Sequence, residues 1–312
     1  MICLICSAAR SGSTLLDVLI GGHAEGASLG EFSFLGKAIA LDQTCSCGAP
    51  LSSCESWAEV FEEVVRERGI DLRTTPYALH QWDALARVVI DHAHQTRKYL
   101  AQTKVHTALC DIRYTFAHGH PLRLPLTRSL RDGIENSFYL YKILKRVWNK
   151  RFLVDSSKNV HKAIALYERD PSQVRVVYLT RDGRAVLHSR QTSGFSTRDS
   201  VRAWYRYNRR ARNLLWRNIP GEHLFRLRYE DLMADPPGAM RRLCEFLKVD
   251  YADSAPEVKP NAQHLINGND MRLKGQQELS LDERWRTGLS LHNRAYFDHY
   301  AGKLNAQLGY VD

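Results

Sequence analysis

The chain has 312 residues, 44% of them hydrophobic, and a formal net charge of +10 at pH 7. This composition is typical of a globular protein with a sizeable core, and we expect no transmembrane segment because no apolar stretch reaches the ~18 residues that one requires. The positive charge favours an anionic partner, whether a phosphorylated small molecule, an acidic polymer, nucleic acid or an anionic membrane face. Seven cysteines suit a reducing compartment, so we expect a cytoplasmic protein.

The chain begins with an apolar run, a small-residue loop and a helical pattern. Residues 2–6 have no basic region ahead of them, so they predict a buried strand and not a signal peptide. Apolar residues at helical spacing predict a helix over about 12–22. A helix N-terminus favours an anion, and a Walker A loop is excluded because no Gly-Lys pair precedes the hydroxyl residue. The candidate anion-binding residues of the loop are Arg10, Ser11, Gly12, Ser13 and Thr14.

The middle of the chain is mainly helical. Residues 44–56 predict a loop, 57–103 are helical in pattern, 104–133 are ambiguous, and a helix is expected near 136–150. Short apolar runs then alternate with helical patterns, which is typical of an α/β fold with a parallel sheet. These runs are RFLVDSSKN, VRVVYLTRDG and HLFRLRYEDL. We therefore predict a single domain over residues 1–312, with a mainly helical insertion at about 57–150.

Two later strand ends carry further polar groups. Arg181 follows the run VRVVYLT, Asp182 is placed to cap the next helix, and Ser189 lies about two turns into that helix. Asp155 closes another strand, and Lys158 follows it. Because the carboxyl ends of parallel strands meet at one edge of a sheet, these groups are expected to gather beside the first loop.

These motifs together resemble the sulfotransferases that use 3′-phosphoadenosine 5′-phosphosulfate (PAPS). In that family a P-[KR]-S-G-[ST]-[ST] loop binds the 5′-phosphosulfate, and residues 10–14 are similar, with Ala9 in place of proline. The family's 3′-phosphate element has an arginine at a strand end and a serine eight positions later, which Arg181 and Ser189 match. The segment RDGRAVLHS is similar in sequence to the corresponding segment of tyrosylprotein and carbohydrate sulfotransferases. The resemblance implies an α/β three-layer, P-loop-like sandwich with a central parallel sheet.

The resemblance also implies roles for single residues. Glu31 matches the position of a catalytic glutamate in tyrosylprotein sulfotransferases and is the expected base, with Glu25 as a nearby competitor. Arg10 would neutralise the leaving 5′-phosphate, and Lys158 would lie near the bridging oxygen, although many relatives have the lysine where Ser156 stands. A C-terminal basic loop that covers the 3′-phosphate in the family is similar to the segment containing Arg272, Lys274 and Gly275.

The implied reaction transfers a sulfuryl group from PAPS to an acceptor hydroxyl and leaves adenosine 3′,5′-bisphosphate. Carbohydrate, tyrosine and small-molecule alcohol acceptors all stay open, and we expect that no metal is required. Cys45, Cys47 and Cys54 resemble a short Cys-rich segment of some bacterial sulfotransferases. Because no fourth Cys or His lies nearby in the sequence, unpaired packing is favoured over a disulfide or a metal site.

The sequence leaves two other functions open. A small-molecule P-loop kinase would need a magnesium-binding aspartate, for which Asp155 is the candidate. A nucleic-acid or anionic-polymer binding protein is suggested by the Arg- and aromatic-rich residues 202–218. That stretch is also typical of one amphipathic helix with Trp204 turned inward, and we expect no nucleic-acid partner. Trp285 is expected to pack in the core.

Overall fold

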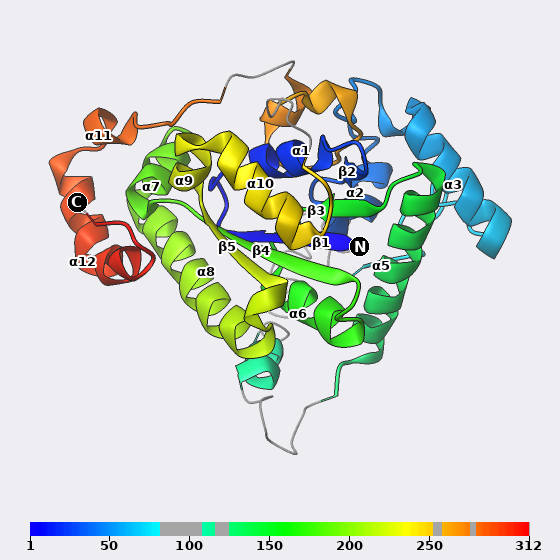
Figure 1. Cartoon of the computed structure of the whole chain (residues 1–312), viewed down its shortest axis with the longest axis horizontal. Helices are drawn as coiled ribbons and strands as arrows, with labels where there is room; N and C mark the ends of the chain where they lie inside the picture. Colours follow the sequence, from blue (N-terminus) through cyan, green and yellow to red (C-terminus); the bar gives the residue numbers. More distant parts are fainter. Residues whose placement is uncertain (82–107, 116–124, 252–257, 275–278, 312) are drawn as a thin grey trace, which may run out of the picture.

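The computed structural model describes residues 1–81, 108–115, 125–251, 258–274 and 279–311. This part of the chain forms a five-stranded parallel sheet in the order β2-β3-β1-β4-β5 (Figure 1). The strands are β1 (Ile2–Ser7), β2 (Gly26–Ser28), β3 (Phe152–Asp155), β4 (Val174–Thr180) and β5 (Leu224–Arg228).

The centre of the sheet is β1, which is buried along its whole length. Ile2 pairs with Leu153 of β3 on one side and with Val174 of β4 on the other. The chain builds β2 and β3 on one side of β1, and then crosses to build β4 and β5 on the other side. Ligands of such sheets bind outside the carboxyl ends of the strands, where the strand order reverses. The loop that follows β1 lies at that point.

Helices cover both faces of the sheet (Figure 1). Side chains of a strand alternate between faces, so Cys3 and Ile5 pack with α1 and α10, whereas Ile2 and Leu4 pack with α3, α5 and α6. The longer helices are α1 (Ser13–Gly21), α3 (Glu55–Arg68), α5 (Arg128–Val147), α6 (Val160–Arg169), α7 (Gly183–Gln191), α8 (Thr197–Asn218), α10 (Pro236–Leu247) and α12 (Leu291–Gln307). The short ones are α2 (Leu35–Ala40), α9 (Tyr229–Ala234) and α11 (Trp285–Gly288).

Residues 108–115 are also helical, and single turns of 3-10 helix connect several of the longer elements. They are η1 (Phe32–Phe34), η2 (Leu51–Ser53), η4 (Gly221–His223), η5 (Pro260–Ala262) and η6 (Asp270–Leu273). The C-terminal helix α12 packs against α7 and α8, and its Phe297 contacts Trp204 edge-on with ring centroids 5.4 Å apart. Among the described residues, no helix is both long and apolar enough to cross a bilayer.

The parallel α/β architecture predicted from the alternating runs is confirmed. The helix expected near 136–150 begins earlier, at Arg128, where the Thr127 side chain accepts a hydrogen bond from the Leu130 amide and caps the helix. The predicted loop at 44–56 contains η2 and ends at the start of α3. The helical pattern predicted over 57–103 is wrong for residues 69–81, because α3 ends at Arg68, where Gly69 adopts φ +65°, and turns follow. The remainder of that pattern, 82–103, lies outside the described residues.

Candidate active site

The loop between β1 and α1 presents a helix N-terminus at the switch point of the sheet. Gly12 is the N-cap of α1 and has φ +88°, a conformation that favours glycine. A Cβ at Gly12 would lie 2.7 Å from a ring carbon of Tyr229, so the loop and this ring are in close contact. Ser11 is fully buried, and its Oγ has no hydrogen-bond partner among the described residues. The loop therefore offers free donors at the start of α1.

Arg10 connects this loop to α7. Its Nε donates to the Oγ of Ser189 at 3.1 Å, and its Nη2 donates to the Oγ of Ser193 at 2.8 Å. Arg10 has φ +71°, an uncommon conformation for a residue other than glycine. The strained backbone and the two side-chain contacts keep the guanidinium beside α7, with Ser189 next to it.

Arg181 directly follows β4. Its buried guanidinium lies at the same edge of the sheet as the loop after β1. Its Nη1 donates to the Arg10 carbonyl at 3.2 Å, and its Nη2 forms an ion pair with Asp282 at 3.1 Å. Its guanidinium lies 4.5 Å from the centroid of the Tyr229 ring, and its Nε is buried without a partner in the described structure. Hydrogen bonds from Arg284 and Arg181 lower the pKa of Asp282 well below its usual range. Asp282 is thus a carboxylate held between two arginines.

Glu31 and Lys158 form a direct ion pair at the other side of this region. The Glu31 amide donates to the Ile266 carbonyl at 3.0 Å, and the Tyr207 hydroxyl donates to the Lys158 carbonyl at 2.8 Å. Both charged side chains are partly exposed, at 24% and 17% of their full area. A carboxylate and an ammonium are therefore held together where a substrate can reach them.

These groups line one cavity of about 430 Å³. Its lining residues are Ala9, Arg10, Gly12, Ser13, Thr14, Leu15, Glu31, Lys158, Arg181, Ser189, Tyr229, Gly268, Asn269, Met271, Asp282 and Arg284. The residues predicted from three separate strand ends thus meet at one place, together with Glu31. Ser11 does not line the cavity because it is buried beneath it.

The expected C-terminal basic loop is only partly at this cavity. Gly268, Asn269 and Met271 line it, and the Asn269 amide donates to the Thr14 Oγ at 3.4 Å. The Arg272 guanidinium is buried and donates to the Thr44 carbonyl, and Arg272 is not among the lining residues. Lys274 is exposed and also does not line the cavity, and Gly275 lies outside the described residues.

The buried partner of Asp155 was missed by reasoning from the sequence. Lys162 is 2% exposed and donates to Asp155 at 2.8 Å, and the Tyr141 hydroxyl also donates to Asp155 at 2.5 Å. Burial opposes the Asp155 charge, but the Lys162 ammonium and hydrogen bonds from Lys162, Ser157 and Tyr141 lower its pKa below the usual value. A lysine one turn into a helix that follows a strand-end aspartate was the available signal.

Asp17 is a second missed group, on the buried side of α1. Its Oδ2 accepts hydrogen bonds from the Gly30 amide at 3.1 Å and from Ser156 at 2.6 Å. Burial raises the pKa of Asp17 to about 7, above its ordinary value of 3.8. These bonds join the first helix to the segments that carry Glu31 and Lys158. A single acid in the otherwise apolar run LLDVLIG was the sequence signal.

Two residues singled out in the sequence prove to be structural. Trp285 is 6% exposed, as expected of a packed residue, but its ring lies against guanidinium groups, including that of Arg184 at 4.8 Å from its centroid. Glu25 pairs with Arg151 at 2.7 Å and does not line the cavity. Of the two glutamates, Glu31 therefore lines the cavity and Glu25 does not.

Known proteins share sequence features and the fold with this chain. The sequence model of the "Sulfotransferase family" matches residues 3–253, whereas a search of curated proteins gave no match. The sulfotransferase domain from the curacin biosynthetic pathway is 19% identical, with a TM-score of 0.50 over 100% of this chain and 98% of that chain. The sulfotransferase domain of the olefin synthase from Synechococcus PCC 7002 is also 19% identical, with a TM-score of 0.49 over 100% and 95% of the two chains.

A third solved structure is that of a sulfotransferase from Mycobacterium avium. It is 16% identical and has a TM-score of 0.42, with 97% of this chain and 76% of that chain covered.

Proposed function

This chain belongs to the sulfotransferase family, and on that premise we propose that it transfers a sulfuryl group from PAPS to an acceptor hydroxyl. The observation that carries the proposal is the cavity at the start of α1. Arg10, Arg181 and Ser189 converge there as an anion site, and Glu31 and Lys158 lie in the same cavity as an acid–base pair.

The residues present fit a donor with two separate anionic ends. The amides of residues 11–14 and the positive end of the α1 dipole suit the 5′-phosphosulfate. Arg181 and Ser189 suit the 3′-phosphate, because an arginine fork and a hydroxyl are strong phosphate partners. The Nε of Arg181 is a buried donor without a partner among the described residues, and it needs an acceptor. We retain Lys274 as a candidate for the 3′-phosphate; Gly275 lies outside the described residues, and we assign Arg272 a different role below.

The bonding changes of the transfer require a base and a positively charged environment. The acceptor oxygen forms a bond to sulfur while its proton passes to Glu31, and the bond between sulfur and the bridging oxygen of the 5′-phosphate breaks. The electron pair of that bond stays on the departing phosphate, where Arg10, Lys158 and the α1 amides stabilise it. PAPS supplies the activated sulfuryl group, and the residues of this chain supply position and charge.

The two alternative functions fit the structure less well. In the kinase reading, Asp155 would face a magnesium ion, but Asp155 is 1% exposed and holds Lys162 and Tyr141 instead. In the polymer-binding reading, residues 202–218 would present aromatic side chains, but Trp204 is 1% exposed inside the amphipathic helix α8. Asp155 is therefore not open to a metal ion. Of the two tryptophans in residues 202–218, only Trp216 is exposed, at 38%, and the Arg226 guanidinium lies 4.3 Å from the centroid of its ring.

Donor binding is tested by titration calorimetry with adenosine 3′,5′-bisphosphate and, separately, with ATP and magnesium. We expect the bisphosphate to bind and the triphosphate to bind far more weakly. Tight binding of ATP with magnesium, with no heat from the bisphosphate, would contradict the proposal.

The assigned base is tested by Glu31→Gln with Glu25→Gln as the matched control. Labelled PAPS is incubated with pools of carbohydrate, tyrosine-peptide and small-alcohol acceptors, and sulfated products are identified by mass spectrometry. We expect Glu31→Gln to bind the bisphosphate normally and to lose turnover, whereas Glu25→Gln keeps both. Retained turnover in Glu31→Gln would refute the assignment. The same screen identifies the acceptor class.

A further inference from the structure

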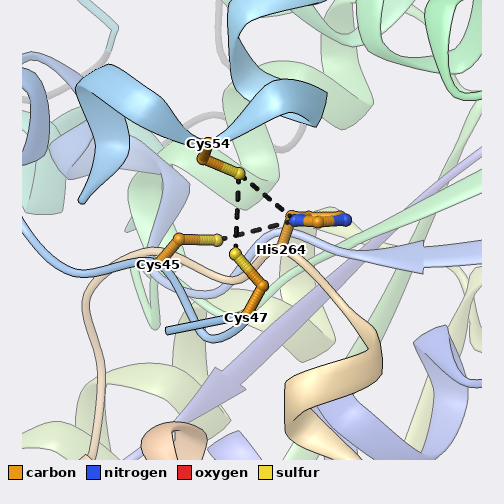
Figure 2. A group of neighbouring side chains, drawn as sticks. All are labelled: Cys45, Cys47, Cys54 and His264. Atoms are coloured by element: carbon orange, nitrogen blue, oxygen red, sulfur yellow. Dashed lines mark hydrogen bonds between the residues drawn. The ribbon is translucent and has the colours of Figure 1, made fainter. Parts of the chain in front are cut away.

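Three cysteines and a histidine from distant parts of the chain form a compact cluster away from the cavity (Figure 2). Cys45 and Cys47 lie in the loop before η2, Cys54 is the N-cap residue of α3, and His264 lies between η5 and η6. Their sulfur and ring-nitrogen atoms all lie within 4.8 Å of one another. Unpaired packing was favoured from the sequence because the histidine follows Cys54 by 210 positions.

The distances match the edges of a zinc tetrahedron. With Zn–S bonds of about 2.3 Å and a Zn–N bond of about 2.0 Å, tetrahedral angles separate two sulfurs by about 3.8 Å and sulfur from nitrogen by about 3.5 Å. The Sγ atoms of Cys47 and Cys54 are 3.7 Å apart. The Nδ1 of His264 lies 3.4 Å from the Cys54 sulfur and 3.7 Å from the Cys45 sulfur.

Groups around the cluster are arranged as they are around metal ligands. The Nε2 of His264 lies 2.8 Å from the Ser56 Oγ, which leaves Nδ1 facing the three sulfurs. Such a bond from the second ring nitrogen typically orients a metal-binding histidine. The His264 carbonyl also accepts a hydrogen bond from the Trp57 indole at 3.0 Å, which fixes the backbone behind the ring.

Burial of the cluster is a cost that a bound cation would offset. Cys45 and Cys54 are buried, and a buried thiolate without a partner is costly. A divalent cation bound to the three thiolates offsets that cost.

Arg272 supplies the remaining charge. Zinc with three thiolates and a neutral imidazole has a net charge of −1. Arg272 is 7% exposed, and its Nε has no partner among the described residues. Its Nη1 donates to the carbonyl of Thr44, the residue directly before Cys45. The Arg272 guanidinium is therefore bonded to the backbone next to the first cysteine of the proposed anionic zinc site.

We propose that Cys45, Cys47, Cys54 and His264 form a structural zinc site, bound through three Sγ atoms and Nδ1. Four protein ligands close the coordination sphere, so the metal has no open position for a substrate. Binding releases the three thiol protons, and no electron transfer is involved. The four ligands do not line the cavity of the proposed transfer reaction, so the two sites are separate.

The zinc site joins the cysteine loop to the segment around His264, which leads into one wall of the cavity. The Ser46 Oγ also joins the two segments, because it donates to the Gln263 carbonyl at 2.6 Å. Ile266, two residues after the histidine, accepts the Glu31 amide, and Gly268 lines the cavity. A metal bound to residue 264 therefore restrains the segment that supports Glu31.

The test measures zinc directly in the full-length protein, purified under reducing conditions without a metal-affinity column. Elemental analysis by mass spectrometry should find one zinc per chain. Cobalt(II) exchanged into the site should show the d–d bands of tetrahedral coordination and a sulfur-to-cobalt charge-transfer band. These two measurements need no variant, so misfolding of a variant does not affect them.

Variants then identify the ligands. Cys54→Ser and His264→Ala should each lose the metal and lower the melting temperature, whereas Cys244→Ser, a buried cysteine of α10, should keep one zinc per chain. A folded wild-type chain without zinc, with no cobalt spectrum, would overturn the proposal. A Cys47–Cys54 disulfide in that metal-free chain, seen as a loss of two hydrogens, would overturn it in favour of a redox pair.

Discussion

Replacement of Arg181 by lysine tests the anion site most directly. The guanidinium has three different contacts, an ion pair with Asp282, a hydrogen bond to the Arg10 carbonyl and a position over the Tyr229 ring. Lysine keeps the positive charge but presents a single ammonium group in place of a planar fork of donors. Arg181→Lys therefore changes geometry at constant charge.

The magnitude follows from the lost donor. A charged hydrogen bond contributes about 1.5–3 kcal/mol, so the loss of one bond to the 3′-phosphate corresponds to roughly 10- to 150-fold weaker binding. Arg181→Ala removes the charge as well and should abolish measurable binding. The loss in Arg181→Lys cannot come from a change of net charge, because this variant has the same net charge as the wild type.

The assay is titration calorimetry with adenosine 3′,5′-bisphosphate at fixed salt, with melting temperatures measured in parallel. Arg175→Lys is the control, because Arg175 is buried at the opposite end of β4 and donates to the Val174 carbonyl at 2.9 Å. The control should bind as the wild type does. Wild-type affinity in a folded Arg181→Lys variant would refute the assignment of this arginine to the phosphate.

Three further substitutions test the groups around the cavity. Gly12→Ala sets a Cβ 2.7 Å from the Tyr229 ring at φ +88°, which costs about 1–2 kcal/mol for the backbone alone; calorimetry should show weaker bisphosphate binding, and unchanged binding would contradict the close contact. Lys162→Met leaves the Asp155 carboxylate buried and unpaired, at a cost of about 3–5 kcal/mol in urea unfolding, and the double variant with Asp155→Asn should recover part of it. The raised pKa of Asp17, about 7 against 3.8, means that its contribution to stability is fully present below pH 3.8 and is lost as pH rises through 7. Asp17→Asn should remove this loss from unfolding free energies measured between pH 4 and 8, and parallel curves for the two proteins would count against it.

Much of the strand–loop–helix unit at the start of the chain was predictable from local sequence. An apolar run, a Gly12 turn and helical spacing after it are features of neighbouring residues, and neighbouring residues decide the loop that they form. The interval between Arg181 and Ser189 was informative for the same reason. A capping Asp182 begins α7, and two turns of helix then carry Ser189 to the cavity.

Element boundaries were less predictable. The start of α5 at Arg128 was missed because the first turns contain Gly133 and few apolar residues, so the periodicity is weak there. The cap at Thr127 was the only local signal. Packing of Leu130 and Ile134 against the core stabilises these turns in the folded chain.

The sequence by itself determined the parallel α/β fold, the glycine loop after β1 and the residues at each strand end, because these depend on short-range patterns. Tertiary structure alone decided which distant groups meet. Glu31 reaches Lys158, and His264 reaches the cysteines, because the sheet and the segment after η5 bring them together. Charged and metal-binding groups find partners wherever the fold offers them, and the wide separation of Glu31 from Lys158 and of Cys54 from His264 gives no sequence signal of these contacts.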